Sequence, residues 1–101
     1  MSRTKKVSKA DVEELADLLS MMVENVVDNP DAVEVVVSHA IKSVRFQFKC
    51  AESDSGQVIG VQRQTINAIE RVMFAAANAR QLSVDVQFSN DRATHHAGDG
   101  S

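Results

Sequence analysis

The alternation of apolar and polar residues divides the chain into an ordered middle and two polar ends. A helix is predicted from Ser8, which can cap it, with Asp11 three residues further on in an approximate capping box. Apolar residues then recur at helical spacing, at Val12, Leu15, Ala16, Leu19, Met22, Val23 and Val26. The segment Asp28-Asn29-Pro30-Asp31 stops this helix, because Pro30 cannot continue it and biases Asn29 away from helical angles.

Two strands are predicted after this turn. The first has on one face Val33, Val35 and Val37, and on the other Glu34, Val36 and Ser38. The second alternates strictly, with Val44, Phe46, Phe48 and Cys50 on one face and Arg45, Gln47 and Lys49 on the other, as expected of a strand with one buried face. Residues 39–42 are too few for anything but a tight connection, so the two strands should form an antiparallel hairpin.

The second half of the chain predicts two helices and a last strand. Gly56-Gln57-Val58-Ile59-Gly60 reads as a short helical turn, and a longer helix runs from about Gln64 to Arg80. In the last strand, the residues expected to face inward are Leu82, Val84, Val86 and Phe88. A helical crossover between the second and third strands makes them parallel. The expected fold is α+β, with the order α-β-β-α-α-β and a three-stranded mixed sheet packed on three helices.

Length and composition fit one small domain. The 101 residues are too few for two domains, and we place the domain at residues 9–88. The basic stretch 1–8 and the Gly-, Ser-, Asp- and His-rich stretch 89–101 are predicted to be disordered, because neither carries enough apolar residues to order itself. One cysteine, Cys50, suits a reducing compartment. Without a signal-peptide pattern or a membrane-length apolar run, we expect a cytoplasmic protein that does not enter membranes.

No pattern of catalytic or metal-binding residues stands out. The sequence contains no Walker loop, dinucleotide fingerprint, HExxH or nucleophile elbow, and the carboxylates of the first helix read as a solvated face. The adjacent His95 and His96 in a polar tail make a poor metal site. We therefore expect no enzymatic activity, cofactor or metal.

Two segments resemble a known family. Residues 27–35, Val-Asp-Asn-Pro-Asp-Ala-Val-Glu-Val, are similar to the passage that opens the sheet in small one-domain bacterial KH proteins of the KhpA (YlqC-like) family. Gly56 to Gly60, followed by Thr65, Ala68, Ile69 and the run 75–77, resembles their KH signature. The similarity covers residues 11–88. It implies a type II KH fold, which agrees with the element order predicted above.

The resemblance also implies an RNA-binding site. KH domains hold about four nucleotides, clamped by a GXXG loop. Here the loop is Gly60-Val61-Gln62-Arg63, so the second glycine is replaced by Arg63 and the clamp is degenerate. Family members similar to this one usually carry a basic residue at the position of Val61. The candidate RNA-binding residues are Gly56, Val58, Ile59, Gly60, Val61, Gln62, Arg63, Gln64, Arg45 and Lys49.

Several of these residues also have an ordinary structural interpretation. Gly60 and Ile59 can serve the fold alone, and Arg63 is either a solvated residue at a helix start or a phosphate contact. Arg45 and Lys49 can be solvated strand charges. Between residues 51 and 80 acids and bases balance, and the whole chain carries a formal charge of -3. A basic footprint for RNA must therefore be local, and binding should be weak.

Two functions remain open on the sequence. The first is a small RNA-binding protein that contacts single-stranded RNA weakly through the Gly60–Arg63 loop and the adjacent groove. The second is a KH domain with a decayed clamp that acts in protein contact. The resemblance implies pairing with a second copy, as a homodimer, or with a larger KH protein of the KhpB type. Phe74 falls off the apolar stripe of the long helix, so we take Phe74 and Met73 as the candidate interface.

Overall fold

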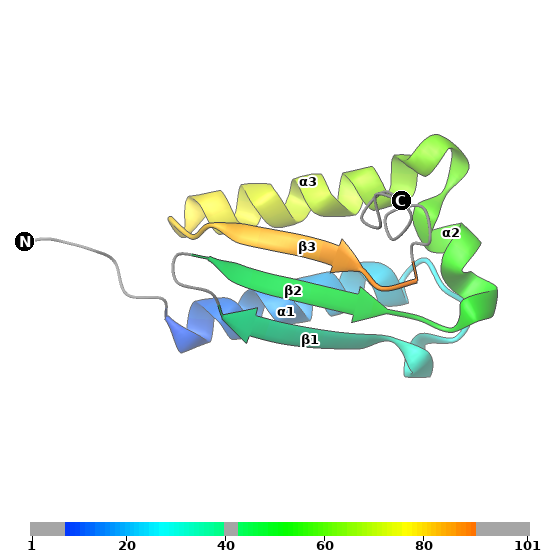
Figure 1. Cartoon of the computed structure of the whole chain (residues 1–101), viewed down its shortest axis with the longest axis horizontal. Coiled ribbons are helices and arrows are strands. Elements are labelled where there is room, and N and C mark those ends of the chain that lie inside the picture. Colours follow the sequence, from blue (N-terminus) through cyan, green and yellow to red (C-terminus); the bar gives the residue numbers. More distant parts are fainter. Residues whose placement is uncertain (1–7, 40–42, 91–101) are drawn as a thin grey trace, which may run out of the picture.

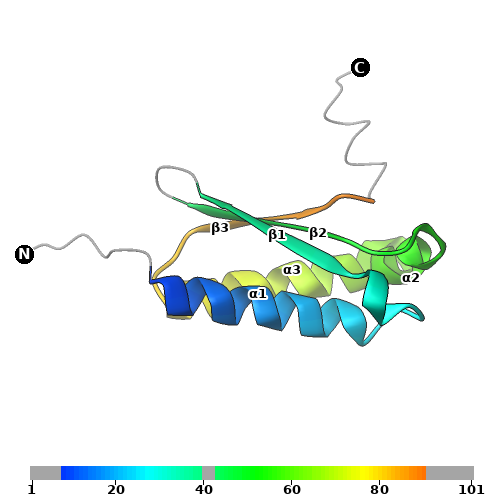
Figure 2. The same ribbon diagram turned by 90° about the horizontal axis from the view of Figure 1, so that it is seen from below.

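The computed structural model describes residues 8–39 and 43–90 and shows two layers. A three-stranded sheet forms one layer, and the helices form the other layer, packed against one face of the sheet (Figures 1 and 2). The elements are α1 (Lys9–Glu24), β1 (Glu34–His39), β2 (Val44–Lys49), α2 (Ser55–Ile59), α3 (Gln64–Ala79) and β3 (Val84–Phe88), with 3-10 turns at Pro30–Ala32, Glu52–Asp54 and Val61–Arg63. The predicted α+β fold and element order are confirmed. No helix within the described ranges is long and apolar enough to cross a membrane.

The first helix begins at its predicted cap. The Ser8 hydroxyl oxygen accepts a hydrogen bond of 3.4 Å from the Asp11 backbone N–H, which satisfies one of the free donors of the first turn. Along α1 the fully buried positions recur every three or four residues, at Val12, Leu15, Leu19 and Val23. At the far end of α3, Arg80 pairs with Glu14 at 3.1 Å and ties the two helices together.

The sheet has the predicted topology. β1 and β2 pair antiparallel, β2 and β3 pair parallel, and β2 is the central strand. The strict alternation of β2 places Val44, Phe46 and Phe48 on the buried face. Phe48 stacks on Phe88 of β3, with ring centroids 4.8 Å apart. His39, which the sequence places in the connection, is the last residue of β1 and pairs with Val44. Residues 40–42 lie outside the described residues.

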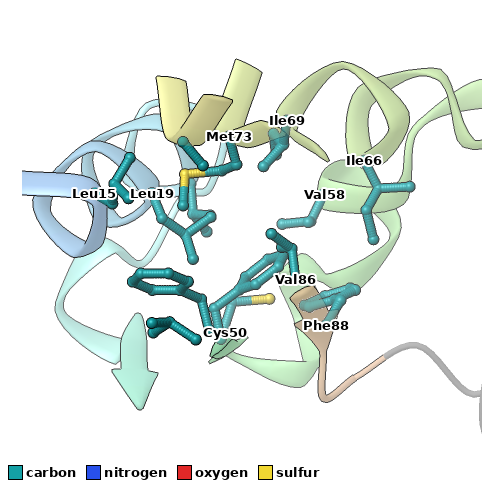
Figure 3. Close-up of a cluster of buried hydrophobic side chains, with 14 of the residues drawn as sticks. Leu15, Leu19, Cys50, Val58, Ile66, Ile69, Met73, Val86 and Phe88 are labelled. Atoms are coloured by element: carbon teal, nitrogen blue, oxygen red, sulfur yellow. The ribbon is translucent and has the colours of Figure 1, made fainter. Parts of the chain in front are cut away.

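The core fills the space between sheet and helices, and it holds two residues that the sequence assigns to function. Figure 3 shows Val58 of α2 and Met73 of α3 directed into this cluster. Both side chains are completely buried, at 0% exposure. Val58 as an RNA contact and Met73 as an interface residue are therefore corrected: each serves the packing of its helix on the sheet. The remaining buried apolar residues are Val12, Leu15, Leu19, Val23, Val44, Phe46, Phe48, Cys50, Ile66, Ile69, Ala77, Val86 and Phe88.

Hydrogen bonds to the sheet continue past the end of β3 at Phe88. Ser89 and Asn90, which the sequence places in the tail, are held against β2. The Ser89 backbone N–H donates to the carbonyl oxygen of Phe48 at 2.8 Å. The Asn90 side chain bonds both the N–H and the C=O of Cys50, at 3.0 and 3.2 Å. The predicted disorder of residues 1–7 and 91–101, with His95 and His96, concerns segments outside the described residues.

Candidate nucleic-acid interface

Gly60 lies at the junction of α2 and the loop, in a backbone conformation that other residue types do not adopt. Its φ of 77° and ψ of 174° lie in a region that is essentially restricted to glycine. A Cβ built on Gly60 would lie 2.4 Å from the side-chain oxygen of Thr65. The first glycine of the predicted clamp is therefore required by backbone geometry and by the close packing of Thr65, independently of any ligand.

The second clamp position keeps a glycine-like backbone although it carries an arginine. Gln62 and Arg63 have φ values of 55° and 60°, in the left-handed region. A residue with a side chain loses roughly 1–2 kcal/mol of stability in the left-handed conformation, and glycine does not. The position of the second clamp glycine thus has a backbone conformation that suits glycine, although it carries Arg63. The pattern of residue types could not predict this, because neither Gln nor Arg favours a positive φ.

The start of α3 adds a polar surface to the loop. Among the described residues, no side chain caps this helix. The free N–H groups of an uncapped first turn point outward and carry the positive end of the helix dipole, so they favour an anion. Val61 is 78% exposed, Gln62 and Gln64 are exposed, and Arg63 is half-buried. Together these residues form an exposed loop that can meet a phosphate chain through its backbone groups.

The short helix α2 contributes Gly56, Val58 and Ile59. Gly56 lies in the first turn of α2 and is exposed, and a Cβ at this position would meet nothing within 4 Å. Glycine inside a helix lowers stability by about 0.5–1 kcal/mol relative to alanine. The packing of the described residues gives no reason for a glycine at position 56. Ile59 is half-buried and packs against the core, which supports its structural interpretation.

Arg45 and Lys49 lie on a different surface. The burial pattern of β2 places both side chains on the exposed face of the sheet, and Figure 2 shows that the helices lie against the other face. Arg45 pairs with Asp85 at 3.1 Å, and Lys49 pairs with Glu34 at 3.5 Å. The structure does not bring them together with the Gly60–Arg63 loop, which belongs to the helical layer. The two residues are solvated strand charges and are removed from the candidate site.

A buried aspartate, which the sequence did not single out, holds the start of α2 in place beside the candidate site. Asp54 is 1% exposed and directly precedes α2. Its Oδ2 accepts hydrogen bonds from the backbone N–H and the side-chain amide of Asn29, at 3.0 and 3.1 Å. This contact fixes the turn after α1 to the start of α2. The only available signal was an acid in an otherwise polar loop, 25 residues from its partner.

Phe74 projects outward as predicted, with 45% exposure. A second exposed apolar residue of α3, Val72, is 44% exposed and lies two residues, or about 160° around the helix, from Phe74, so the two do not form one patch. Val72 lines a shallow groove of about 320 Å³ between α1 and α3, together with Met22, Asn25, Val26, Thr65, Ala68 and Ile69.

The fold and the loop define the class of protein. A parallel β2–β3 pair is joined through two helices, with a glycine-initiated loop between them, and this is the arrangement of a KH domain. The chain belongs to the KhpA/KhpB family of KH domains: the family model described as "KhpA/KhpB, KH domain" matches residues 16–88. The resemblance found in the sequence is thereby confirmed.

Individual relatives support this assignment. The chain is 37% identical over 73 residues to the RNA-binding protein KhpA of Caldanaerobacter subterraneus subsp. tengcongensis, covering 72% of this chain and 97% of the relative. It is 36% identical over 74 residues to the RNA-binding protein KhpA of Bacillus subtilis, covering 73% and 89%. The KhpA protein of Chlamydia caviae is 24% identical over 78 residues, covering 77% and 100%.

Proposed function

We propose that this protein binds single-stranded RNA weakly, in the cytoplasm, through the loop Gly60–Arg63 and the adjacent ends of α2 and α3. The observation that carries the proposal is the backbone of this loop. Its first residue, Gly60, has a conformation that requires glycine, its fourth residue, Arg63, has a positive φ that glycine would adopt without cost, and the loop leads into an uncapped helix start. The relatives named above are RNA-binding proteins, which supports the same ligand class.

Weak binding follows from the charges near the loop. The bases between residues 51 and 80 are Arg63, Arg71 and Arg80. Arg80 lies at the other end of α3 and pairs with α1, so it does not belong to the loop. Each phosphate contact on a single strand contributes about -0.7 to the slope of log K against log salt. With Arg63 and Arg71 as the candidate contacts, we expect a slope between about -0.7 and -1.4.

Gly56 adds a residue-level argument for the same surface. Its bare backbone lies on the exposed side of α2, where a side chain would cost nothing in packing. A glycine kept at such a position leaves room for a ligand backbone to come close. We therefore assign to the RNA site the residues Gly56, Gly60, Val61, Gln62, Arg63 and Gln64, with Arg71 of α3 as the second phosphate contact.

The test is binding of a fluorescently labelled pool of short single-stranded RNA at low and at physiological salt. We expect a dissociation constant in the range of non-specific contact, about 10⁻⁴–10⁻⁶ M. Nanomolar affinity for one short sequence at physiological salt would contradict the weakened clamp. Absence of binding at low salt would contradict RNA as the ligand.

A second candidate function is protein contact through the outward side of α3. The observation that favours it is the exposure of a large apolar side chain on this helix, Phe74, which is 45% exposed. The partner would be a second copy of the chain, or a larger KH protein of the KhpB type. Light scattering of the wild type and Phe74→Ala at micromolar concentrations tests self-association. A wild-type monomer, or a dimer that Phe74→Ala leaves intact, would rule out Phe74 as the homodimer contact.

A further inference from the structure

The basic residues of this chain are concentrated in its first nine positions. Four of the eleven lysines and arginines lie there without an acid among them, so this stretch carries a charge of +4 and the other 92 residues carry -7. The four are Arg3, Lys5, Lys6 and Lys9. The stretch lies outside residues 16–88, the part of the chain that the family model matches. A short run of one positive charge sign is typical of segments that contact nucleic acid.

The structure places the end of this basic stretch far from the Gly60–Arg63 loop. Lys9 is the first residue of α1 and is exposed. The first half of α1 lies beside the C-terminal end of α3, since Arg80 pairs with Asp11 at 3.8 Å and with Glu14 at 3.1 Å. The loop precedes the other end of α3, and a helix of 16 residues is about 24 Å long. Figures 1 and 2 show that α1 begins at the end of the molecule opposite to α2.

The acids of α1 do not neutralise the basic stretch. The first half of this helix carries four acids, and two of them, Asp11 and Glu14, are engaged by Arg80. The other two, Glu13 and Asp17, are then left to oppose four bases. This end of the helical layer therefore keeps an excess of positive charge, whereas acids and bases balance between residues 51 and 80.

Covalent geometry keeps the bases at this end of the molecule. Lys5 and Lys6 precede Ser8 by three and two residues, so they lie within about 11 Å of it. The loop, where a KH domain holds about four nucleotides, lies at the opposite end of α3. One RNA can contact both surfaces only if its strand is long enough to run along the helical layer.

We propose that residues 3–9 are a second RNA contact, which binds the phosphates of a strand whose other part lies in the Gly60–Arg63 loop. The proposal rests on the RNA binding proposed above and adds to it the class of ligand, a single strand that reaches both ends of the helical layer. Four bases contribute up to about -2.8 to the slope of log K against log salt, compared with about -0.7 to -1.4 from Arg63 and Arg71. Because the contact is with phosphates, it adds affinity without sequence preference.

The experiment measures binding of a five-nucleotide and a 20-nucleotide single-stranded RNA to the full chain over a range of salt concentrations. The longer strand offers about 16 positions to a five-nucleotide site, so tighter binding by this factor needs no second contact. We expect the wild type to gain about 100-fold at low salt, with a steeper slope for the longer strand. Lys5→Gln, Lys6→Gln should lower the affinity for the 20-nucleotide strand about tenfold and the magnitude of its slope by about 1.4.

The matched control is Arg45→Gln, Lys49→Gln, which changes the net charge equally on the exposed face of the sheet and should leave the slope unchanged. Equal slopes for the two strand lengths, or equal effects of the two double variants, would overturn the second contact. RNA binding that depends on Lys5 and Lys6 but is indifferent to Val61→Lys, Arg63→Gly would support the second contact and contradict the loop. Absence of binding to both strands would contradict both.

Discussion

Asn29 donates two hydrogen bonds to one oxygen of the buried Asp54, from its backbone N–H at 3.0 Å and from its side-chain amide at 3.1 Å. Asn29 belongs to the turn that follows α1, and Asp54 directly precedes α2. A buried carboxylate is tolerated only when its oxygens are hydrogen-bonded. The pair therefore fixes the position of α2, and with it the loop that begins at Gly60.

We predict that Asn29→Ala destabilises the protein by about 2 kcal/mol, because it removes one hydrogen bond to a buried charge and keeps the backbone donor. The free energy of unfolding in urea measures this. Asn78→Ala, an exposed amide on α3, is the matched control and should change stability by less than about 0.5 kcal/mol. An Asn29→Ala variant as stable as the control would show that Asp54 does not need its side-chain donor.

The two glycines of the signature should respond in opposite directions to alanine. Gly60→Ala combines a forbidden backbone region with a close approach to Thr65, and we expect a loss of about 2–3 kcal/mol. Gly56→Ala should gain about 0.5–1 kcal/mol, since the position is helical and open. Thermal unfolding of both variants gives the answer. If Gly56→Ala is more stable and also binds RNA less well, the bare backbone of Gly56 serves the ligand; unchanged binding would remove Gly56 from the site.

Arg63→Gly is expected to stabilise the domain, because the backbone at this position is left-handed. The gain should be about 1 kcal/mol, in part offset by the greater freedom of glycine in the unfolded chain. Gln81→Gly is a control that shares the geometry: Gln81 has a φ of 60° just beyond α3, far from the loop. Similar gains for both variants would confirm a purely backbone effect. A destabilised Arg63→Gly with a stabilised Gln81→Gly would show that the Arg63 side chain itself holds the loop.

Cys50 should be an unreactive thiol in the folded protein. Burial raises its pKa above the ordinary value of 9.0, and the negative charges of Asp54 and Glu52 raise it further. The thiolate is the reactive form, so we expect a disulfide reagent at pH 8 to label the native protein at least about tenfold more slowly than the denatured chain. Because the native pKa is the higher one, this group leaves stability unchanged below pH 9 and lowers it at more alkaline pH. Equal labelling rates would contradict the burial of Cys50.

Periodicity predicted the fold because each element has a clear pattern and a clear boundary. The strict alternation of β2 and the stop at Pro30 each follow from a local rule, and the structure confirms both. Ser89 and Asn90, which the sequence assigned to the tail, are hydrogen-bonded to β2 and to Cys50, contacts that no local pattern shows.

The candidate site was harder to predict because it depends on contacts and angles that the residue types do not display. Val58 and Met73 belong to the core by their helical positions, and assigning them a surface role was wrong. Arg45 and Lys49 are basic, but their strand places them on the other face of the sheet. The positive φ of Arg63 appears only in the backbone, where it gives the fourth loop position a conformation that suits glycine.

The most direct test of RNA binding through the loop uses the double variant Val61→Lys, Arg63→Gly. Arg63→Gly frees the backbone at the second clamp position, and Val61→Lys restores the lost charge at the exposed tip of the loop. We predict that the affinity of the double variant for the single-stranded RNA pool rises about tenfold over the wild type, or roughly 1.4 kcal/mol. If Arg63→Gly alone abolished the wild-type binding, Arg63 would be a phosphate contact in its own right. Absence of RNA binding in both the folded wild type and the folded double variant would contradict RNA binding at this loop.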